Sequence, residues 1–179
     1  MAGTLRATHM AQPRSDALVL FGITGDLAYK KIFPALQAMA RRGHLTLPVI
    51  GVGRGTMPRE ELVARARDSI ENAGAYDAQA FELLARQLHY VGGDYQDLGT
   101  FQNIRKELGS AERPAFYLAI PPSSFELVID QLTKSGCVQG ARVILEKPFG
   151  RDLASARRLN TILLHHFPES AIFRIDHYL

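Results

Sequence analysis

The sequence predicts an α/β fold with a doubly wound, mainly parallel sheet and helices on both faces. Three observations predict it. Six short apolar runs of strand length recur along the 179 residues, helical segments separate them, and most runs end at glycine, proline or charged residues. Strands that alternate with helices are joined by crossover connections, which make parallel sheets of the Rossmann-like kind. Residues 1–14 lack periodicity and are expected to form a flexible leader, so residues 15–179 make one domain.

Each strand is expected where an apolar run stops at a turn signal. The first run, Ala17–Phe21, stops at Gly22, and the second stops at a Gly-Arg-Gly triplet. Such short, wholly apolar runs are typical of strands buried on both faces of a sheet. The strands are therefore expected at residues 17–21, 48–52, 88–91, 115–120, 142–145 and 171–175.

Helices are expected where apolar residues recur every three or four positions. This spacing predicts helices at residues 26–42, 58–73, 77–86, 98–108, 123–134 and 152–166. Pro34 lies inside the first of them and should kink it or restart it as a first-turn residue, because proline supplies no N–H. Ser123, Ser124 and Asp152 are candidate N-caps for the last two helices.

The composition excludes several classes of protein. Residues 1–54 carry seven basic and two acidic side chains within a chain of net charge +3. This surplus suits a phosphate-bearing small molecule, although a solvated basic helix face explains it equally well, and it is too small to predict nucleic-acid binding. No apolar run approaches the ~20 residues of a membrane span, and no signal-peptide pattern is present. A lone cysteine, Cys137, fits a cytoplasmic protein, and no residue spacing predicts a metal site.

In a sheet of this kind ligands bind outside the carboxyl ends of the strands. Gly22 and Gly25, followed by Ala28, open the first helix directly after the first strand. Glycines at this place allow a tight turn and let a pyrophosphate approach the helix N-terminus, where free N–H groups favour an anion. The alternative is a turn with a purely structural role. The position of the glycines in the first strand–helix unit favours a dinucleotide.

Arg54 follows the second strand with no acid nearby. NAD-binding units place an acid there for the ribose 2′-hydroxyl, whereas NADP-binding units place arginine near the 2′-phosphate. The sequence therefore predicts NADP, against the alternative of a solvated loop arginine. Asp94 and Tyr95 follow the third strand and lie at the same predicted edge.

Two further strands end in polar groups. Lys147 follows the fifth strand and precedes Pro148, which could adopt a cis bond. Lys147 could contact both a substrate hydroxyl and the nicotinamide end of the cofactor, or it could extend from the sheet rim to water. Asp176, His177 and Tyr178 follow the sixth strand. A carboxylate can orient an imidazole, and imidazole and phenol can donate to a phosphate, but spacing leaves open whether His177 is a base or a phosphate donor.

Taken together, the motifs resemble the glucose-6-phosphate dehydrogenase family. The matching stretches are FGITGDLAYKKIFPAL (21–36), GVGR (51–54), FYLAIPPSSF (116–125), LEKPFGRDL (145–153) and FRIDHYL (173–179). The resemblance implies oxidation of glucose 6-phosphate at C1 by NADP⁺, giving 6-phosphogluconolactone and NADPH in the first step of the oxidative pentose phosphate pathway. It also implies a homodimer or homotetramer for the full-length protein.

The resemblance assigns roles residue by residue. The positions expected to bind the cofactor are Gly22, Thr24, Gly25, Asp26, Leu27, Arg54, Asp94, Tyr95 and Lys147. Lys147, His177 and Tyr178 are expected to bind substrate, the last two through its phosphate. Lys147 and Asp176 are the expected catalytic positions, with Asp176 pairing with the family's catalytic histidine.

The chain also departs from the family pattern. The signature continues with Gly-Lys-Glu after RIDHYL, and the catalytic histidine and a large β+α substrate and dimerisation domain are expected beyond Leu179. Residues 1–179 alone are therefore expected to bind NADP⁺ and turn over little or not at all. Tyr29 stands where a basic residue is common, and Phe125 where some members carry tyrosine. The alternatives are a non-catalytic NADP-binding or regulatory module and another sugar oxidoreductase with an EKP strand end, although the latter typically show G-x-G-x-x-G.

Overall fold

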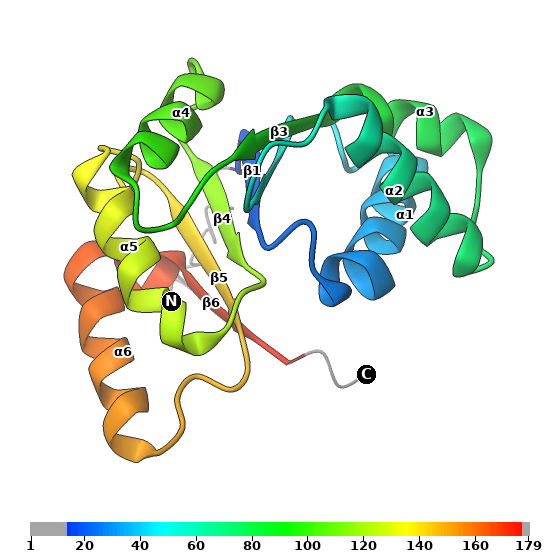
Figure 1. The fold of residues 1–179 in the computed structure, drawn as a ribbon. Coiled ribbons are helices and arrows are strands. Elements are labelled where there is room, and N and C mark those ends of the chain that lie inside the picture. The colour runs from blue at the N-terminus through cyan, green and yellow to red at the C-terminus, as the bar shows by residue number, and fades with distance from the viewer. Residues whose placement is uncertain (1–13, 177–179) are drawn as a thin grey trace, which may run out of the picture.

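The computed structural model describes residues 14–176. Within them six strands form one parallel sheet in the order β3-β2-β1-β4-β5-β6 (Figure 1). The strands are β1 Ala17–Phe21, β2 Val49–Gly53, β3 Leu88–Gly92, β4 Pro114–Leu118, β5 Arg142–Glu146 and β6 Ile172–Ile175. Strands β2 and β3 lie on one side of β1, and strands β4, β5 and β6 lie on its other side. The predicted doubly wound sheet is confirmed, and its switch point lies between the carboxyl ends of β1 and β4.

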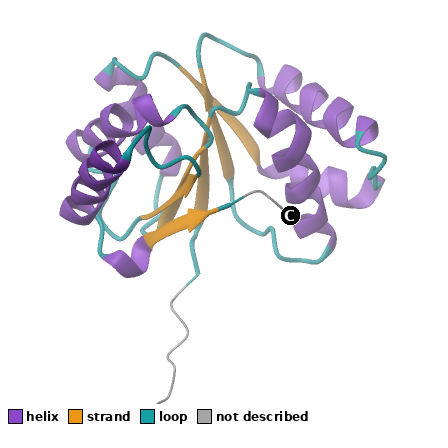
Figure 2. Ribbon diagram, turned by 90° about the horizontal axis from the view of Figure 1, so that it is seen from below, coloured by secondary structure: helices purple, strands orange, loops and turns teal. Residues whose placement is uncertain are grey.

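Helices cover both faces of this sheet (Figure 2). The α-helices are α1 Phe33–Arg41, α2 Arg59–Asn72, α3 Ala78–Gln87, α4 Leu98–Leu108, α5 Phe125–Lys134 and α6 Leu153–His166. The shorter elements are a π-helical segment η1 (Ala28–Ile32) and two 3₁₀ turns, η2 (Pro122–Ser124) and η3 (Glu169–Ala171). Helices α1 to α3 pack on one face and α4 to α6 on the other (Figure 1). None of the helices described in residues 14–176 is both long and apolar enough to cross a membrane.

The two faces carry separate apolar cores because strand side chains alternate between them. Phe21 points to the α4–α6 side and stacks on Phe101 of α4 with ring centroids 5.9 Å apart. Its neighbour Leu20 points to the α1–α3 side, where it is buried in one cluster with Leu62 of α2. Burial on both faces explains why the central strands read as continuous apolar runs.

The ends of the elements agree with the sequence to within a few residues, with one correction. Pro34 lies in the first turn of α1, which restarts the helix after η1 as the sequence predicted. Asp152 caps α6, its Oδ1 accepting from the N–H of Ser155 at 2.8 Å. Ser124 stands at the N-cap position of α5 as predicted, but neither its side chain nor that of Ser123 makes a capping hydrogen bond, and the 3₁₀ turn η2 leads into the helix instead. The predicted leader, apart from its last residue, lies outside the described residues.

Candidate functional site

The turn after β1 requires glycine at its first position. Gly22 has φ +82°, and a Cβ there would lie 2.2 Å from the carbonyl oxygen of Ala119 in the loop after β4. The N–H of Gly22 donates to Val52 of β2 at 2.9 Å, and the N–H of Gly25 donates back to the carbonyl oxygen of Gly22 at 2.9 Å. The left-handed backbone and the close approach both exclude a side chain. The turn therefore runs directly over the switch point.

Free amide groups follow this turn at the start of a helical segment. The N–H of Tyr29 donates to Gly25 at 3.1 Å, which is the first hydrogen bond of the helix. The backbone of residues 14–176 offers no acceptor to the N–H groups of Asp26 and Leu27. Unsatisfied amide groups and the helix dipole together favour an anion at this end. The Asp26 carboxylate itself is solvent-exposed and pairs with Lys30 at 3.3 Å.

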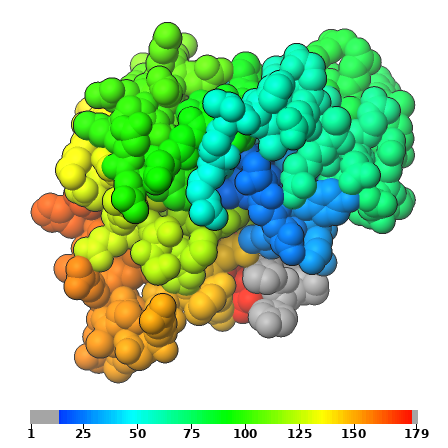
Figure 3. Space-filling view, viewed as in Figure 1, coloured from blue at the N-terminus to red at the C-terminus, as the bar shows by residue number. Residues whose placement is uncertain are grey.

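Arg54 lies at the carboxyl end of β2. Its side chain is exposed and makes no hydrogen bond or ion pair within the described part of the chain, and Gly53 to Pro58 include no acid. Only its backbone is held, the Tyr90 hydroxyl donating to the carbonyl oxygens of Arg54 and Gly55 at 3.3 and 3.2 Å. In the space-filling view the residues that follow β2 (cyan) and those that follow β1 (blue) lie side by side on the surface (Figure 3). Gly53, the residue before Arg54, packs against this turn, since a Cβ there would lie 3.0 Å from the Thr24 side chain.

Asp94 and Tyr95, which follow β3, differ in their surroundings. The Tyr95 ring packs edge-on against Phe21 with centroids 5.6 Å apart. Burial raises the pKa of the Tyr95 phenol, while the Gly22 backbone and the Arg54 charge act in the opposite direction. The structure therefore brings Tyr95 to the glycine turn. Asp94 is exposed, and its carboxylate accepts from the N–H of Gln96 at 2.9 Å.

A cavity of about 350 Å³ continues the edge from β1 toward β5. The carboxyl ends of β4 and β5 and the loops that follow them form its walls, and the turn after β1 contributes one residue. Its lining consists of Leu27, Leu118, Ala119, Ile120, Pro121, Pro122, Glu146, Lys147 and Pro148. Lys147 and Leu27, two predicted site residues from different strand–helix units, thus share one cavity.

Lys147 and Asp176 pair at the ends of β5 and β6. The Lys147 ammonium lies 2.8 Å from Asp176 Oδ2, and the Lys147 N–H donates to the carbonyl oxygen of Ile175 at 3.3 Å. The two side chains remain 57% and 40% exposed. The peptide bond between Lys147 and Pro148 is cis. Both expected catalytic positions therefore meet at the cavity rim, whereas His177 and Tyr178 lie outside the described residues.

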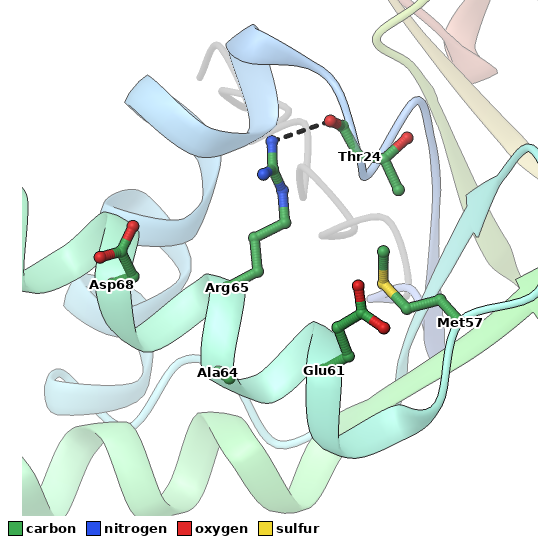
Figure 4. A pocket seen from close by; sticks show the side chains of 6 residues that line it. All are labelled: Thr24, Met57, Glu61, Ala64, Arg65 and Asp68. Atoms are coloured by element: carbon green, nitrogen blue, oxygen red, sulfur yellow. Dashed lines mark hydrogen bonds between the residues drawn. The ribbon is translucent and has the colours of Figure 1, made fainter.

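Two polar contacts at this edge carry no signal in the sequence. The Tyr117 hydroxyl of β4 donates to Glu146, which is buried at the end of β5. Burial, together with the neighbouring carboxylate, raises the pKa of Tyr117 above its ordinary range. On the other side of the turn, Arg65 of α2 donates to the carbonyl oxygen of Thr24 at 2.8 Å (Figure 4). The EKP motif predicted that Glu146 lies at this edge of the sheet, but no feature of the sequence predicted a role there for Tyr117 or Arg65.

These features define the class of protein. A parallel sheet of this order, with a glycine turn at its switch point, is a Rossmann-like dinucleotide-binding domain. The sequence profile described as glucose-6-phosphate dehydrogenase, NAD binding domain, matches residues 19–179. The chain belongs to the glucose-6-phosphate dehydrogenase family, and the part it represents is the coenzyme-binding domain.

Related proteins from bacteria and fungi carry the same family name. Glucose-6-phosphate 1-dehydrogenase 1 of Mycobacterium tuberculosis is 42% identical over 165 residues, and the enzyme of Aspergillus niger is 36% identical over 172 residues. The matches cover 92% and 90% of this chain, but only 35% and 34% of those relatives. The chain therefore spans about a third of their length.

Two solved structures have the same fold. The crystal structure of glucose-6-phosphate 1-dehydrogenase from Mycobacterium avium is 42% identical with a TM-score of 0.86, covering 91% of this chain and 36% of that one. A glucose-6-phosphate dehydrogenase in complex with its substrate glucose 6-phosphate is 33% identical with a TM-score of 0.82, covering 93% and 38%.

Proposed function

We propose that this chain is the coenzyme-binding part of an NADP⁺-dependent glucose-6-phosphate dehydrogenase, which oxidises glucose 6-phosphate at C1 to 6-phosphogluconolactone. The observation that carries the choice of coenzyme is the exposed Arg54 side chain at the carboxyl end of β2, in a segment from Gly53 to Pro58 that contains no acid. An acid at the end of β2 would accept the ribose 2′-hydroxyl of NAD, whereas arginine is complementary to a 2′-phosphate.

The residues present fit a dinucleotide. The glycine turn excludes a Cβ at Gly22 and leaves the amide groups of Asp26 and Leu27 without an acceptor, as a bound pyrophosphate requires. In this proposal Thr24 and Gly25 complete the pyrophosphate turn, Asp94 and Tyr95 lie toward the adenosine end, and Lys147 lies toward the nicotinamide end. Bound NADP⁺ would supply the hydride acceptor.

In this proposal Lys147 binds substrate and takes part in catalysis, and its partner Asp176 has a catalytic role. Their ion pair is exposed at the cavity rim, so solvent screens it and a substrate hydroxyl can take over one of the ammonium donors. His177 and Tyr178 would bind the phosphate of glucose 6-phosphate, and Asp176 would pair with a histidine that acts as general base. We place that base outside residues 1–179. The longer protein would be a cytoplasmic homodimer or homotetramer.

Calorimetric titration with NADP⁺ and NAD⁺ tests the coenzyme assignment. Arg54→Ala should weaken NADP⁺ binding by about tenfold or more, because a charge-assisted contact to phosphate is lost, and should change NAD⁺ binding much less. Arg42→Ala, which removes another exposed arginine at the end of α1, is the matched control and should leave both affinities unchanged. Unchanged NADP⁺ affinity in Arg54→Ala, or no binding of either dinucleotide by the wild-type chain, would contradict the assignment.

The placement of the general base is tested separately by following NADPH formation with glucose 6-phosphate. Pure residues 1–179 should give no sustained turnover, since hydride transfer needs a base for the C1 hydroxyl proton. Sustained NADPH production would overturn this placement and would make His177 the first candidate for the base.

A further inference from the structure

One face of α2 contacts the segment that follows β1. Arg65, Asp68, Ser69 and Asn72 recur at the three- and four-residue spacing that places side chains on the same side of a helix. All four contact Thr24 or Tyr29. We call these four residues the α2 clasp. The proposed function gives it no role, although it grips the segment that carries the free amide groups.

Arg65 holds one end of a single peptide group. The carbonyl and the N–H of a trans peptide point in opposite directions within one plane. In the peptide that joins Thr24 and Gly25, the carbonyl oxygen accepts from Arg65 Nη2 at 2.8 Å, and the N–H donates to Gly22 at 2.9 Å. The plane is therefore fixed from both sides. The peptide group between Thr24 and Gly25 immediately precedes the free N–H of Asp26. Its orientation therefore sets the direction of the amide groups that follow.

The guanidinium of Arg65 is itself held in place. It lies over the Tyr29 ring, 5.1 Å from the centroid, while the Tyr29 hydroxyl donates to Asp68 and accepts from Asn72. The Ser69 hydroxyl donates to the carbonyl oxygen of Tyr29. The cation–π contact and the hydrogen bond to Thr24 together leave the arginine side chain little freedom.

The Nε atom of Arg65 shows which contacts set the orientation of its guanidinium. Its Nε is buried and makes no hydrogen bond within the described residues. Burying a donor without a partner is unfavourable, so the orientation is set by the contacts with Thr24 and the Tyr29 ring. The side chain extends along a cavity of about 390 Å³ toward Thr24, with Met57 and Glu61 on one side and Asp68 on the other (Figure 4).

We propose that Arg65 is a positioning residue of the coenzyme site, which fixes the peptide between Thr24 and Gly25 so that the following amide groups are preorganised for a pyrophosphate. This rests on the proposed function for its ligand. Because NAD⁺ and NADP⁺ share the pyrophosphate, loss of Arg65 affects both dinucleotides equally. Loss of Arg54, in contrast, affects the 2′-phosphate alone. The ratio of the two affinities therefore separates the two arginines.

The binding test compares Arg65→Ala with Arg67→Ala. Arg67 lies on the same helix but pairs with Glu71 and stacks on the rings of Tyr76 and Phe81, away from the turn. Arg65→Ala should weaken NADP⁺ and NAD⁺ by the same factor, about tenfold, because one hydrogen bond from a charged donor is lost. Arg67→Ala should leave both affinities unchanged. A changed ratio of the affinities in Arg65→Ala, or an equal loss in Arg67→Ala, would overturn the proposal.

Hydrogen exchange without any dinucleotide tests the same role independently of the proposed function. In Arg65→Ala the hydrogen-bonded amides of Gly22, Ile23, Gly25 and Tyr29 should exchange about tenfold faster, while those of β1 and β4 stay at the wild-type rate, because only the turn loses its support. Arg65→Lys keeps the charge and an N–H donor group but not the planar fork, so its exchange should be intermediate. Unchanged exchange in Arg65→Ala overturns the proposal whether or not the wild-type chain binds coenzyme. Faster exchange in a chain that binds neither dinucleotide refutes only the proposed function.

Discussion

The two ends of the candidate site are built in different ways. The turn after β1 is held by β2, by the loop after β4 and by the α2 clasp, whose hydrogen bonds from Arg65 and Ser69 are half-buried. At the rim, Lys147 and Asp176 form an exposed ion pair, and the Lys147 N–H donates to the carbonyl oxygen of Ile175.

This difference corresponds to two kinds of binding. A pyrophosphate is recognised by backbone groups whose direction must be set before the ligand arrives, because ordering them during binding would cost affinity. A lysine that contacts a substrate hydroxyl must instead be able to exchange partners, and a solvent-screened ion pair allows this at little cost. Under the proposed function, the turn after β1 would be preorganised for the coenzyme, whereas Lys147 would be free to exchange Asp176 for the substrate.

The largest expected effect tests the rigidity of the turn. Gly22→Ala should lower the free energy of unfolding by about 3 kcal/mol, because the residue has a positive φ and its Cβ would collide with Ala119. Chemical denaturation measures this. Gly43→Ala is the control, since Gly43 has φ +70° but no atom within 4 Å of its Cβ position, and it should lose only about 1 kcal/mol. Equal losses would mean that close packing at the turn contributes nothing.

An intermediate effect is expected beneath the rim. Tyr117→Phe should destabilise the fold by about 2 kcal/mol at neutral pH, because the buried Glu146 carboxylate loses the phenol donor. Tyr76→Phe, at a partly exposed ring whose hydroxyl makes no hydrogen bond in the described residues, is the control and should change little. A negligible loss in Tyr117→Phe would show that the pair contributes no stability to the rim.

Tyr117→Phe should also change how the free energy of unfolding depends on pH above about 10. The folded-state pKa of Tyr117 lies above the ordinary 10.0, so its contribution is fully present below pH 10. Above that pH the unfolded chain ionises first, and the free energy of unfolding falls. Tyr117→Phe should remove up to about 1.4 kcal/mol per pH unit from that fall. An unchanged slope would contradict the raised pKa.

The smallest effect is expected for the rim pair itself. A double-mutant cycle of Lys147→Met and Asp176→Asn should give a coupling energy of about 0.5 kcal/mol or less, since both side chains are well exposed. The coupling should also shrink as salt is added. A coupling of about 2 kcal/mol that is insensitive to salt would mean that Lys147 is locked in place, and the contrast between the two ends would disappear.

The fold could be predicted from the sequence because each strand is buried on both faces and reads as an apolar run. The caps were less predictable. Asp152 has an extended backbone, with φ −151° and ψ 177°, as an N-cap requires, whereas Ser124 is already helical at φ −97° and ψ −9°. The 3₁₀ turn that begins at Pro122 starts the helix early, and residue type alone does not reveal this.

The placement of Gly22, Arg54 and Lys147 at the carboxyl edge of the sheet was predictable, because each of them directly follows a strand, while their binding roles stay predictions. The site was not predictable where side chains from distant segments meet. Arg65 contacts Thr24 41 positions earlier in the chain, and the charged residues of α2 give no sign in the sequence that Arg65 faces the turn while Arg67 does not. Tyr117 and Glu146 likewise meet only because β4 and β5 are neighbours in the sheet.

Because Gly22 lies so close to Ala119, the turn after β1 reaches its final form only when the segment after β4 has packed against it. Its support from β2 and α2 comes from residues made early during synthesis, but Ala119 belongs to the later half of the sheet. A chain that has completed only its first three strands therefore cannot form the finished turn. A dinucleotide that binds there would select chains in which both halves have joined, and by mass action it would stabilise the whole domain against unfolding.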